Sequence, residues 1–384
     1  MLRPVGNRVP LPKSENKLSL PWKENYQTWL MGSGTEALSA AVMLAVGRRQ
    51  LEGTTPEVIL PAYGCPDLVA AVVAQNAMPV LVDLQPNLPF MDTERLDEAI
   101  SHATVAVVGV GFLGLPERLE KLAKIASTND VWLIEDSAQC FPPDCVREPL
   151  ADCVVLSFGR GKPINLMGGG ALMVREDHKS LAQNCLPQLP VFERKIDWKW
   201  KLRRKIINGL LGRRAYGLLR RAPFLGVGKT AYKPLSGVSR LRFPDELLDA
   251  GIDRAQVMAS ISEKYVKALE FLKPQGWHLF MEDVAAAEKH AGRRVLRYGI
   301  LAPNELARNR VIEELNALGI GANSFYGQAL PGIVGVADIL GATLEDYPNA
   351  VAFGDRLITL PSHEDVTPRD VDVIESVFKK MLEV

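Results

Sequence analysis

Residues 131–170 read VWLIEDSAQCFPPDCVREPLADCVVLSFGRGKPINLMGGG. Two short apolar runs stand in this segment, and the first runs into Asp136 whereas the second runs into Ser157. Beyond Ser157, Lys162 follows a glycine-bearing turn and precedes the run Gly168–Gly170. Short apolar runs rich in β-branched residues are typical of buried strands. The acid and the lysine are therefore both expected just beyond strand ends.

The same alternation of apolar runs and helical patterns extends over residues 26–175. Six runs predict strands: Val58–Leu60, Val80–Val82, Val105–Val110, Val131–Ile134, Val154–Leu156 and Ala171–Val174. Four intervening patterns predict helices: Glu36–Arg49, Asp67–Gln75, Thr93–Ile100 and Pro116–Ser127. Strands that alternate with helices indicate an α/β fold with a mostly parallel sheet covered on both faces. Such sheets bind ligands at the carboxyl ends of their strands, where Asp136 and Lys162 are expected.

An amine and a carboxylate placed in this way suit the chemistry of pyridoxal 5′-phosphate (PLP). The Lys162 amine would bond covalently to the cofactor's aldehyde, and the Asp136 carboxylate would keep the ring nitrogen protonated so that the ring accepts electrons. Each residue also has a more ordinary interpretation, because most lysines are solvated and many aspartates cap helices. Their occurrence with a phosphate-binding pattern in one α/β domain favours the catalytic interpretation.

The phosphate-binding pattern lies near the N-terminus, where residues 31–38 read MGSGTEAL. An apolar segment leads through glycines into a helix, whose first N–H groups lack partners and can bind phosphate. Ser33, Gly34 and Thr35 are therefore predicted to bind the cofactor. The bland alternative is a plain helix start with Ser33 or Thr35 as its cap.

A competing interpretation is a dinucleotide-binding fingerprint, as in an NAD-dependent dehydrogenase. Residues 109–114 read GVGFLG, follow an apolar run and precede a helical pattern, and two acids end the next predicted strand. However, the helix is expected to begin at Pro116, after the last glycine, and about a hundred residues of strand and helix precede the motif. Both features count against a dinucleotide site.

The length of 384 residues suits two domains. We expect a large PLP-binding domain at 1–255 and a smaller C-terminal α+β domain at 256–384. The formal net charge is zero, so nothing indicates nucleic acid as a partner. Five cysteines without a CxxC pair argue against a disulfide framework or a metal site, and for a reducing cytoplasm. The N-terminus lacks a signal core, and no apolar run approaches the ~18 residues of a spanning helix.

Residues 191–242 differ from the rest of the chain in charge. They contain fifteen Lys and Arg against Glu193 and Asp197, so this basic segment carries +13 and the remainder of the chain −13. Tryptophans and branched apolar residues are interspersed, and a helical projection gives one basic face with Lys201, Arg204 and Lys205. The segment could be an insertion packed on the large domain with a solvated rim. It could also meet an anionic membrane surface, with the protein peripheral there, or a phosphate-bearing substrate or carrier protein.

Together these motifs resemble those of the DegT/StrS family of PLP-dependent aminotransferases. The segments that carry the resemblance are 32–38, 57–62, 78–83, 111–116, 134–139, 157–170, 318–321 and 360–363. They cover nearly the whole chain apart from the basic segment. The resemblance implies the fold-type-I architecture of aspartate-aminotransferase-like enzymes. It also implies a homodimer whose subunits share the active site.

Residue by residue, the resemblance implies that PLP would be held by Lys162 at its aldehyde, Asp136 at the ring nitrogen, Gln139 near the ring oxygen, and Ser157, Gly34 and Thr35 at the phosphate. Cys65 stands where the family commonly has an aromatic residue stacked on the ring, and Tyr63 is the nearest aromatic. Gly169 stands where the family often has an acidic residue. The segment by which a partner subunit offers an asparagine is not recognisable, with Ser236 or Ser239 as guesses.

The implied activity is transfer of an amino group from an amino acid, glutamate, to a keto or aldehyde acceptor, a keto-sugar nucleotide. The differences from the family pattern leave open other acceptors, namely a lipid- or carrier-linked carbonyl or an aminocyclitol precursor. A dehydratase of the family is disfavoured, because those replace the lysine that this chain keeps. A non-catalytic regulator with the PLP fold and the NAD-dependent dehydrogenase are more distant alternatives.

Overall fold

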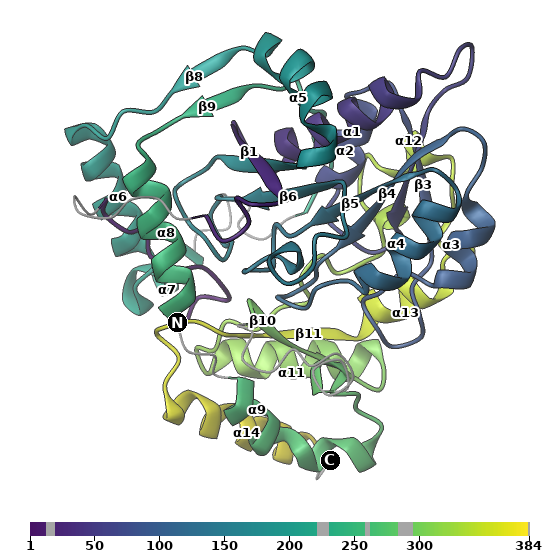
Figure 1. The fold of residues 1–384 in the computed structure, drawn as a ribbon. Helices are drawn as coiled ribbons and strands as arrows, with labels where there is room; N and C mark the ends of the chain where they lie inside the picture. Colours follow the sequence, from purple (N-terminus) through teal and green to yellow (C-terminus); the bar gives the residue numbers. More distant parts are fainter. Residues whose placement is uncertain (13–19, 221–229, 258–261, 283–294, 383–384) are drawn as a thin grey trace.

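The computed structural model describes residues 1–12, 20–220, 230–257, 262–282 and 295–382. A nine-stranded sheet forms its centre, in the strand order β3-β2-β4-β5-β6-β7-β1-β9-β8 (Figure 1). The strands are β1 (Tyr26–Met31), β2 (Glu57–Pro61), β3 (Met78–Val82), β4 (Thr104–Val110), β5 (Trp132–Asp136), β6 (Cys153–Ser157), β7 (Gly170–Arg175), β8 (Val191–Glu193) and β9 (Arg240–Arg242). The six predicted strands are β2 to β7.

The sheet is mostly parallel, as predicted. Strands β3, β2, β4, β5 and β6 pair in parallel, whereas β7 runs antiparallel to both β6 and β1. The carboxyl ends of β5 and β6 therefore lie at the same edge, and they carry Asp136 and Ser157. Parallel neighbours bring these two side chains to the same side of the sheet although twenty residues separate them in sequence.

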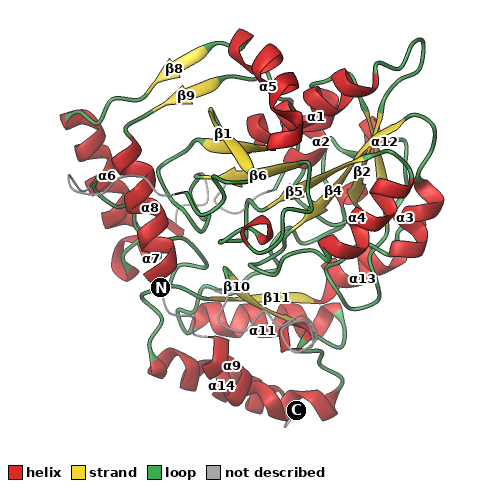
Figure 2. Ribbon diagram, viewed as in Figure 1, coloured by secondary structure: helices red, strands yellow, loops and turns green. Residues whose placement is uncertain are grey.

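Two hydrophobic cores lie on opposite faces of the sheet, because successive residues of a strand point to opposite sides. On β2, Val58 and Leu60 belong to one core and Ile59 to the other. Helices cover both faces (Figure 2). They are α1 (Gly34–Arg49), α2 (Asp67–Val73), α3 (Thr93–Ala99), α4 (Leu119–Thr128), α5 (Lys179–Cys185) and α8 (Asp245–Val257). The α/β layering follows from strands that are apolar on both faces.

The C-terminal part of the chain packs against the large sheet as a smaller α+β unit. Its two strands, β10 (Arg297–Leu301) and β11 (Leu357–Pro361), pair antiparallel. The accompanying helices are α9 (Ser262–Leu269), α11 (Glu305–Ala317), α12 (Ala337–Leu340), α13 (Pro348–Arg356) and α14 (Pro368–Leu382). The boundary expected between residues 255 and 256 falls near the C-terminal end of α8 and stays a prediction. One core cluster runs through both units, from α1 to α14.

The basic segment forms β8, α6 (Trp198–Leu210), α7 (Arg213–Arg220) and β9. Its two short strands pair with each other, and β9 also pairs with β1 through Met31 and Arg240. The ends of the segment thus extend the large sheet at its β1 edge, while α6 lies at the periphery (Figure 1). Among the described residues, no helix combines the length and hydropathy needed to span a bilayer.

Candidate active site

The N-terminus of α1 points at the carboxyl edge of the sheet. Ser33 caps the helix, since its hydroxyl accepts a hydrogen bond from the amide of Glu36 at 3.1 Å. The amides of Gly34 and Thr35 have no partner within the helix, because the first turn of any α-helix leaves its N–H groups free. This is the geometry that binds a phosphate. Ser33 therefore serves the helix itself, and a role for its hydroxyl toward the cofactor stays a prediction.

The side chain of Ser157, at the end of β6, lies directly against this helix end. A Cβ atom at position 34 would approach Ser157 Cβ to 2.6 Å and Ser157 Oγ to 2.8 Å, closer than any side chain tolerates. Gly34 is thus required for the helix to reach the strand end. A hydroxyl and helix-terminal amides converge here, and that donor set suits the phosphate group of PLP.

Lys162 lies on a loop, residues 158–169, that closes back on itself. The amide of Phe158 donates to the carbonyl of Gly169 at 2.9 Å, and the Lys162 amide donates to the Gly159 carbonyl at 3.3 Å. Gly161 has a φ of +81°, a conformation that glycine adopts without strain. Glycine turns therefore place this lysine, as the sequence predicts.

Asp136 ends β5 and is buried in the same region. Its Oδ1 atom accepts a hydrogen bond from the Ala138 amide at 2.9 Å. Burial raises the pKa of the Asp136 carboxyl, and Asp67 raises it further, whereas the Ala138 amide and the positive charge of Lys162 lower it. A buried carboxylate of this kind is stabilised by a cation beside it, and a protonated ring nitrogen is such a cation.

One pocket collects most of the predicted site. Its lining consists of Gly34, Thr35, Leu38, Cys65, Asp67, Leu68, Asp136, Ala138, Ser157 and Lys162. Six of the eight predicted site residues are in that set; Ser33 and Gln139 are not. Five separate segments of the chain meet there, at the carboxyl edge predicted for ligand binding. The amine, the acid and the phosphate-binding helix end are therefore close together, and the residues present fit PLP.

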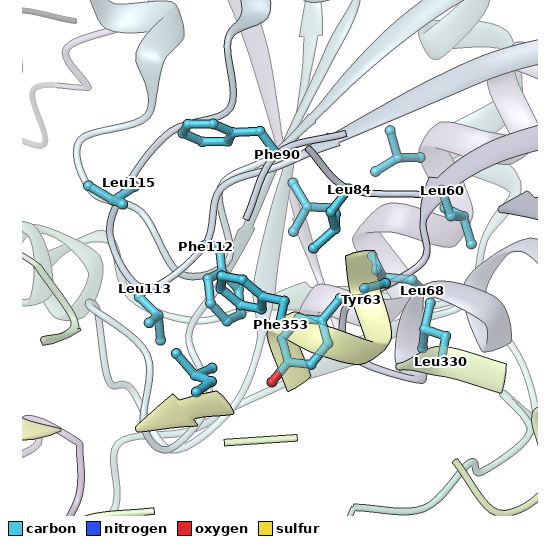
Figure 3. Packing of buried hydrophobic residues seen from close by; sticks show 14 of the residues in the cluster. Leu60, Tyr63, Leu68, Leu84, Phe90, Phe112, Leu113, Leu115, Leu330 and Phe353 are labelled. Atoms are coloured by element: carbon cyan, nitrogen blue, oxygen red, sulfur yellow. The ribbon is translucent and has the colours of Figure 1, made fainter. Parts of the chain in front are cut away.

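Cys65 lines the pocket and Tyr63 does not. Burial is the main reason that the pKa of the Cys65 thiol rises to about 11, with Asp67 adding to the rise and Lys162 opposing it. Tyr63 turns into a buried aromatic group, where its ring centroid is 5.2 Å from that of Phe353 and 5.6 Å from that of Phe112 (Figure 3). Tyr63 thus packs between the two units of the chain. The side chain that lines the pocket here is therefore the thiol of Cys65 and not an aromatic ring.

Gln139 joins the pocket's edge to the C-terminal unit. Its Nε2 atom donates to the Tyr326 hydroxyl at 3.0 Å, and its Oε1 atom accepts from the Leu113 amide at 3.2 Å. Burial is the main reason that the pKa of Tyr326 is raised, and nearby Cys65, Tyr63 and Asp136 add to the rise. Tyr326 therefore lies beside the pocket. Sequence reasoning missed it, because it comes from a turn almost two hundred residues away with no local motif.

Asp67 is the other lining residue that sequence reasoning missed. It is the first residue of α2 and accepts a hydrogen bond from the Thr35 hydroxyl at 3.1 Å. Thr35 is predicted to bind the phosphate, and in the structure its hydroxyl donates to this carboxylate. The signal was present in the sequence, since Asp67 follows β2 at the carboxyl edge of the sheet.

The dinucleotide interpretation of residues 109–114 is wrong. β4 ends at Val110 and α4 begins only at Leu119, later than the predicted start at Pro116. The intervening residues form a turn closed by hydrogen bonds between the backbones of Phe112 and Leu115, at 2.8 and 2.9 Å. A pyrophosphate site needs the helix N-terminus inside the glycine run, and here the glycines precede the helix.

Ser239 lies at the base of α1 within the same chain. Its amide and its hydroxyl donate to Glu36 Oε2 at 2.8 and 2.5 Å, and its carbonyl accepts from the Gly32 amide at 3.0 Å. These bonds tie β9 to the start of the phosphate-binding helix. The guess that Ser239 reaches a partner's phosphate stays untested.

Comparison with known proteins gives one consistent relationship. Residues 27–194 match the model of the DegT/DnrJ/EryC1/StrS aminotransferase family. GDP-perosamine synthase of Caulobacter vibrioides is 24% identical over 91% of this chain and 84% of its own length. The 3-oxo-glucose-6-phosphate:glutamate aminotransferase of Bacillus subtilis is 26% identical over 67% of this chain, and the alignment spans only 54% of that relative.

Solved structures agree on the fold. The PLP form of Spr1654 from Streptococcus pneumoniae, assigned as a sugar aminotransferase, superposes with a TM-score of 0.67 at 20% identity. The superposition covers 94% of this chain and 88% of that one. The predicted fold-type-I architecture is confirmed. Together with the aminotransferases among the relatives, the match over residues 27–194 confirms the predicted resemblance to the DegT/DnrJ/EryC1/StrS aminotransferase family and the predicted cofactor, pyridoxal 5′-phosphate.

Proposed function

We propose that the protein transfers an amino group from glutamate to the carbonyl carbon of a keto-sugar carried on a nucleotide. The observation that carries this proposal is the single pocket in which Lys162, Asp136, Ser157 and the Gly34–Thr35 helix end meet. The relatives named above act on sugars, which favours a sugar acceptor. A regulator without catalysis would not need an amine and an acid kept together in a buried pocket.

Each of these residues has a chemical part to play. The amides of Gly34 and Thr35, with the Ser157 hydroxyl, would hold the cofactor phosphate. Asp136 would hold the positive charge of the ring nitrogen, and Lys162 would hold the cofactor covalently between turnovers. When bound, PLP supplies an electron-poor ring that stabilises negative charge at the carbon that loses its proton. The Lys162 amine would remove the proton from the donor's carbon as a base and would then deliver it, as an acid, to the carbon on the other side of the transferred nitrogen.

The acceptor has a second candidate. The end of the basic segment lies beside the strand that leads into the pocket helix, because Arg240 of β9 pairs with Met31 of β1. Its charge of +13 suits a diphosphate group, whether that group joins the sugar to a nucleotide or to a lipid. A lipid-linked keto-sugar is therefore the alternative acceptor that the chain's own charge favours. We further propose a homodimer, for which light scattering should give about twice the chain mass of 42.2 kDa.

The decisive variant is Lys162→Ala. Purified wild-type protein loaded with PLP should show a visible absorption band that borohydride bleaches, and it should transfer nitrogen from glutamate. The variant should lose the band and at least about 10³-fold in rate, because it lacks both the covalent anchor and the proton carrier. The matched control is Lys121→Ala, an exposed lysine on α4, which should keep both properties.

Acceptor identity needs a separate screen with the wild-type enzyme. Keto-sugar nucleotides, a lipid-diphosphate keto-sugar, cyclic ketones and simple keto acids are offered with glutamate or glutamine as donor. The proposal expects turnover on the nucleotide-linked sugars. Retained transfer by Lys162→Ala would refute the mechanism, and turnover confined to simple keto acids would refute the sugar acceptor.

A further inference from the structure

Exposed apolar side chains gather on the basic segment. Fifteen large hydrophobic residues are exposed among the described residues, and seven of them fall within residues 191–218. The seven are Val191, Phe192, Trp198, Leu202, Ile206, Leu210 and Leu218. Apolar residues scattered singly over a surface need no explanation, whereas a concentration of this kind marks an interaction site.

Helix α6 has two different faces, and one of them is fully used by the fold. Trp200 is buried in the core on one side of the sheet, and Ile207 packs against the same core. Asn208 exchanges hydrogen bonds with the backbone of Val9, donating to its carbonyl at 3.0 Å and accepting from its amide at 2.8 Å. The Nε atom of Arg204 donates to the Val9 carbonyl at 2.9 Å. The inner face is therefore fixed to the body of the protein.

This arrangement corrects the helical projection made from sequence. The projection groups Arg204 with Lys201 and Lys205 on one basic face, but in the structure the Arg204 side chain turns inward and donates to backbone carbonyls. The inner face of α6 contains the apolar side chains of Trp200 and Ile207 as well as these hydrogen-bonding residues, so the helix buries one apolar side. The other apolar side stays on the surface.

The outer face of α6 is formed by Trp198, Leu202, Ile206 and Leu210. These residues recur at every fourth position, so they form one ridge along the helix, opposite the buried Trp200 and Ile207. Trp198 is 68% exposed, and Leu202 and Ile206 are 50% and 54% exposed. An amphipathic helix that buries a single face would show polar residues here instead.

Only positive charges border this ridge within the helix. Lys199, Lys201, Arg203 and Lys205 are all exposed, and residues 198–210 contain no acid. The Nζ atom of Lys199 lies 5.8 Å above the centre of the Trp198 ring. An apolar ridge with a tryptophan at one end and cations along both sides is complementary to a layer of anionic headgroups over acyl chains.

We propose that the outer face of α6 binds the surface of an anionic lipid bilayer, with the helix lying parallel to the membrane plane. Thirteen residues give a helix about 20 Å long, too short to span a bilayer but sufficient to lie in its interface. The ridge inserts among the acyl chains, while the lysines reach the headgroup phosphates. This inference does not depend on the proposed reaction.

The test is vesicle flotation with the full-length protein. Vesicles of phosphatidylcholine alone are compared with vesicles containing about one third phosphatidylglycerol, at low and at high salt. Wild-type protein should float with the anionic vesicles at low salt and be released by salt. The triple variant Trp198→Ser, Leu202→Ser, Ile206→Ser should partition at least about tenfold less, since three inserted side chains are lost. Lys199→Glu with Lys201→Glu and Lys205→Glu should abolish flotation.

Two control variants change the same chemistry elsewhere on the molecule. Leu306→Ser with Leu318→Ser and Val334→Ser removes exposed apolar side chains far from α6 in sequence, and Lys121→Glu with Lys124→Glu and Lys264→Glu reverses exposed charges. Both controls should float like the wild type. Circular dichroism and thermal unfolding confirm that each variant folds.

Three results would overturn the proposal. The wild type could fail to float with anionic vesicles, or the controls could lose flotation as much as the α6 variants. Light scattering could instead show that the α6 serine variant changes the oligomeric state while vesicle binding is absent. In that last case the outer face of α6 is a contact between copies of this chain.

Discussion

At the scale of single residues, the two neighbouring acids of β5 have opposite environments. Asp136 lines the pocket, whereas Glu135 points to the other face of the sheet and is buried there. Glu135 accepts hydrogen bonds from the Ser137 hydroxyl at 2.5 Å and from the amides of Asp144 and Cys145 at 2.6 and 3.1 Å. Burial nevertheless raises the pKa of Glu135 to about 7, because these bonds only partly oppose it. The same strand thus supplies one acid to the pocket and one acid to the opposite, buried face, where its pKa is raised.

Glu135 should make the stability of the protein depend on pH. Its folded pKa lies above the unfolded value, so its contribution is fully present below about pH 4.5 and is lost as the pH rises toward 7. A shift of this size corresponds to ~3 kcal/mol over that window. In Glu135→Gln, the free energy of unfolding from urea denaturation should vary less between pH 4.5 and 7.

The slope with pH, and not the absolute stability, is the quantity to compare. An amide NH₂ at position 135 would face backbone N–H donors, so Glu135→Gln also lowers stability at every pH. Glu94→Gln, at an exposed position of α3, is the control and should leave the slope unchanged. An equal slope in wild type and Glu135→Gln would show that this carboxyl does not titrate in the window.

At the scale of elements, helix α1 carries two glycines with opposite constraints. Gly34 faces Ser157 so closely that a Cβ atom would lie 2.6 Å from the serine Cβ, whereas a Cβ atom at Gly47 would meet nothing within 4 Å. The backbone also approaches closely on the other side of this contact between the helix start and the sheet, since a Cβ atom at Gly170 would lie 2.6 Å from the Ser33 carbonyl carbon. The start of α1 is therefore pressed into the sheet edge, whereas the surface at Gly47 is open.

Gly34→Ala and Gly47→Ala should separate helix propensity from site geometry. Gly47→Ala should raise the free energy of unfolding by about 0.5–1 kcal/mol and leave PLP affinity unchanged. Gly34→Ala should weaken PLP binding at least about tenfold, because the helix end must move away from Ser157 and the phosphate-binding amides move with it. Titration of the apoprotein with PLP, followed by absorbance, measures this. Equal PLP affinity in the two variants would contradict the predicted phosphate site.

At the scale of the whole molecule, the two units are joined by hydrogen bonds as well as by the shared core. Asp83, just after β3, is buried and caps α13 of the C-terminal unit. Its two carboxylate oxygens accept from the amides of Asn349 at 3.0 Å and Ala350 at 2.8 Å. The Asn349 side chain donates in return to the Leu84 carbonyl at 2.8 Å. Residues more than 260 apart in sequence thus complete one helix cap.

Removing this cap should loosen the contact between the units. Asp83→Ala leaves buried amides without an acceptor and should lower the free energy of unfolding by about 1–3 kcal/mol. Asp92→Ala removes a comparable cap of α3 that is exposed to water, and should cost about 1 kcal/mol or less. Urea unfolding followed by tryptophan fluorescence compares the two. A smaller loss for Asp83→Ala than for Asp92→Ala would show that the cap between units is not needed.

Local patterns in the sequence were sufficient for the α/β class, six strands of the sheet and most of the pocket. The hydrophobic periodicity reports which segments are buried, and parallel strands bring their carboxyl ends to one edge, so Asp136, Ser157 and Lys162 could be predicted together. Glycines at strand ends indicated where backbone approaches closely. The same reasoning overlooked Asp67, although the sequence placed it at that edge.

Other features depended on contacts between distant segments. Tyr326 lies at the pocket's edge because it accepts a hydrogen bond from Gln139, whereas Tyr63 packs on Phe353 away from the pocket. Neither position can be predicted from the neighbouring residues in the sequence. For α6, the helical projection predicted a basic face but not which residues the body of the protein would cover. Sequence alone determined which residue types stand at strand ends and helix starts, because those depend on local periodicity. Only the tertiary structure decided which faces are buried, because burial depends on what packs against them.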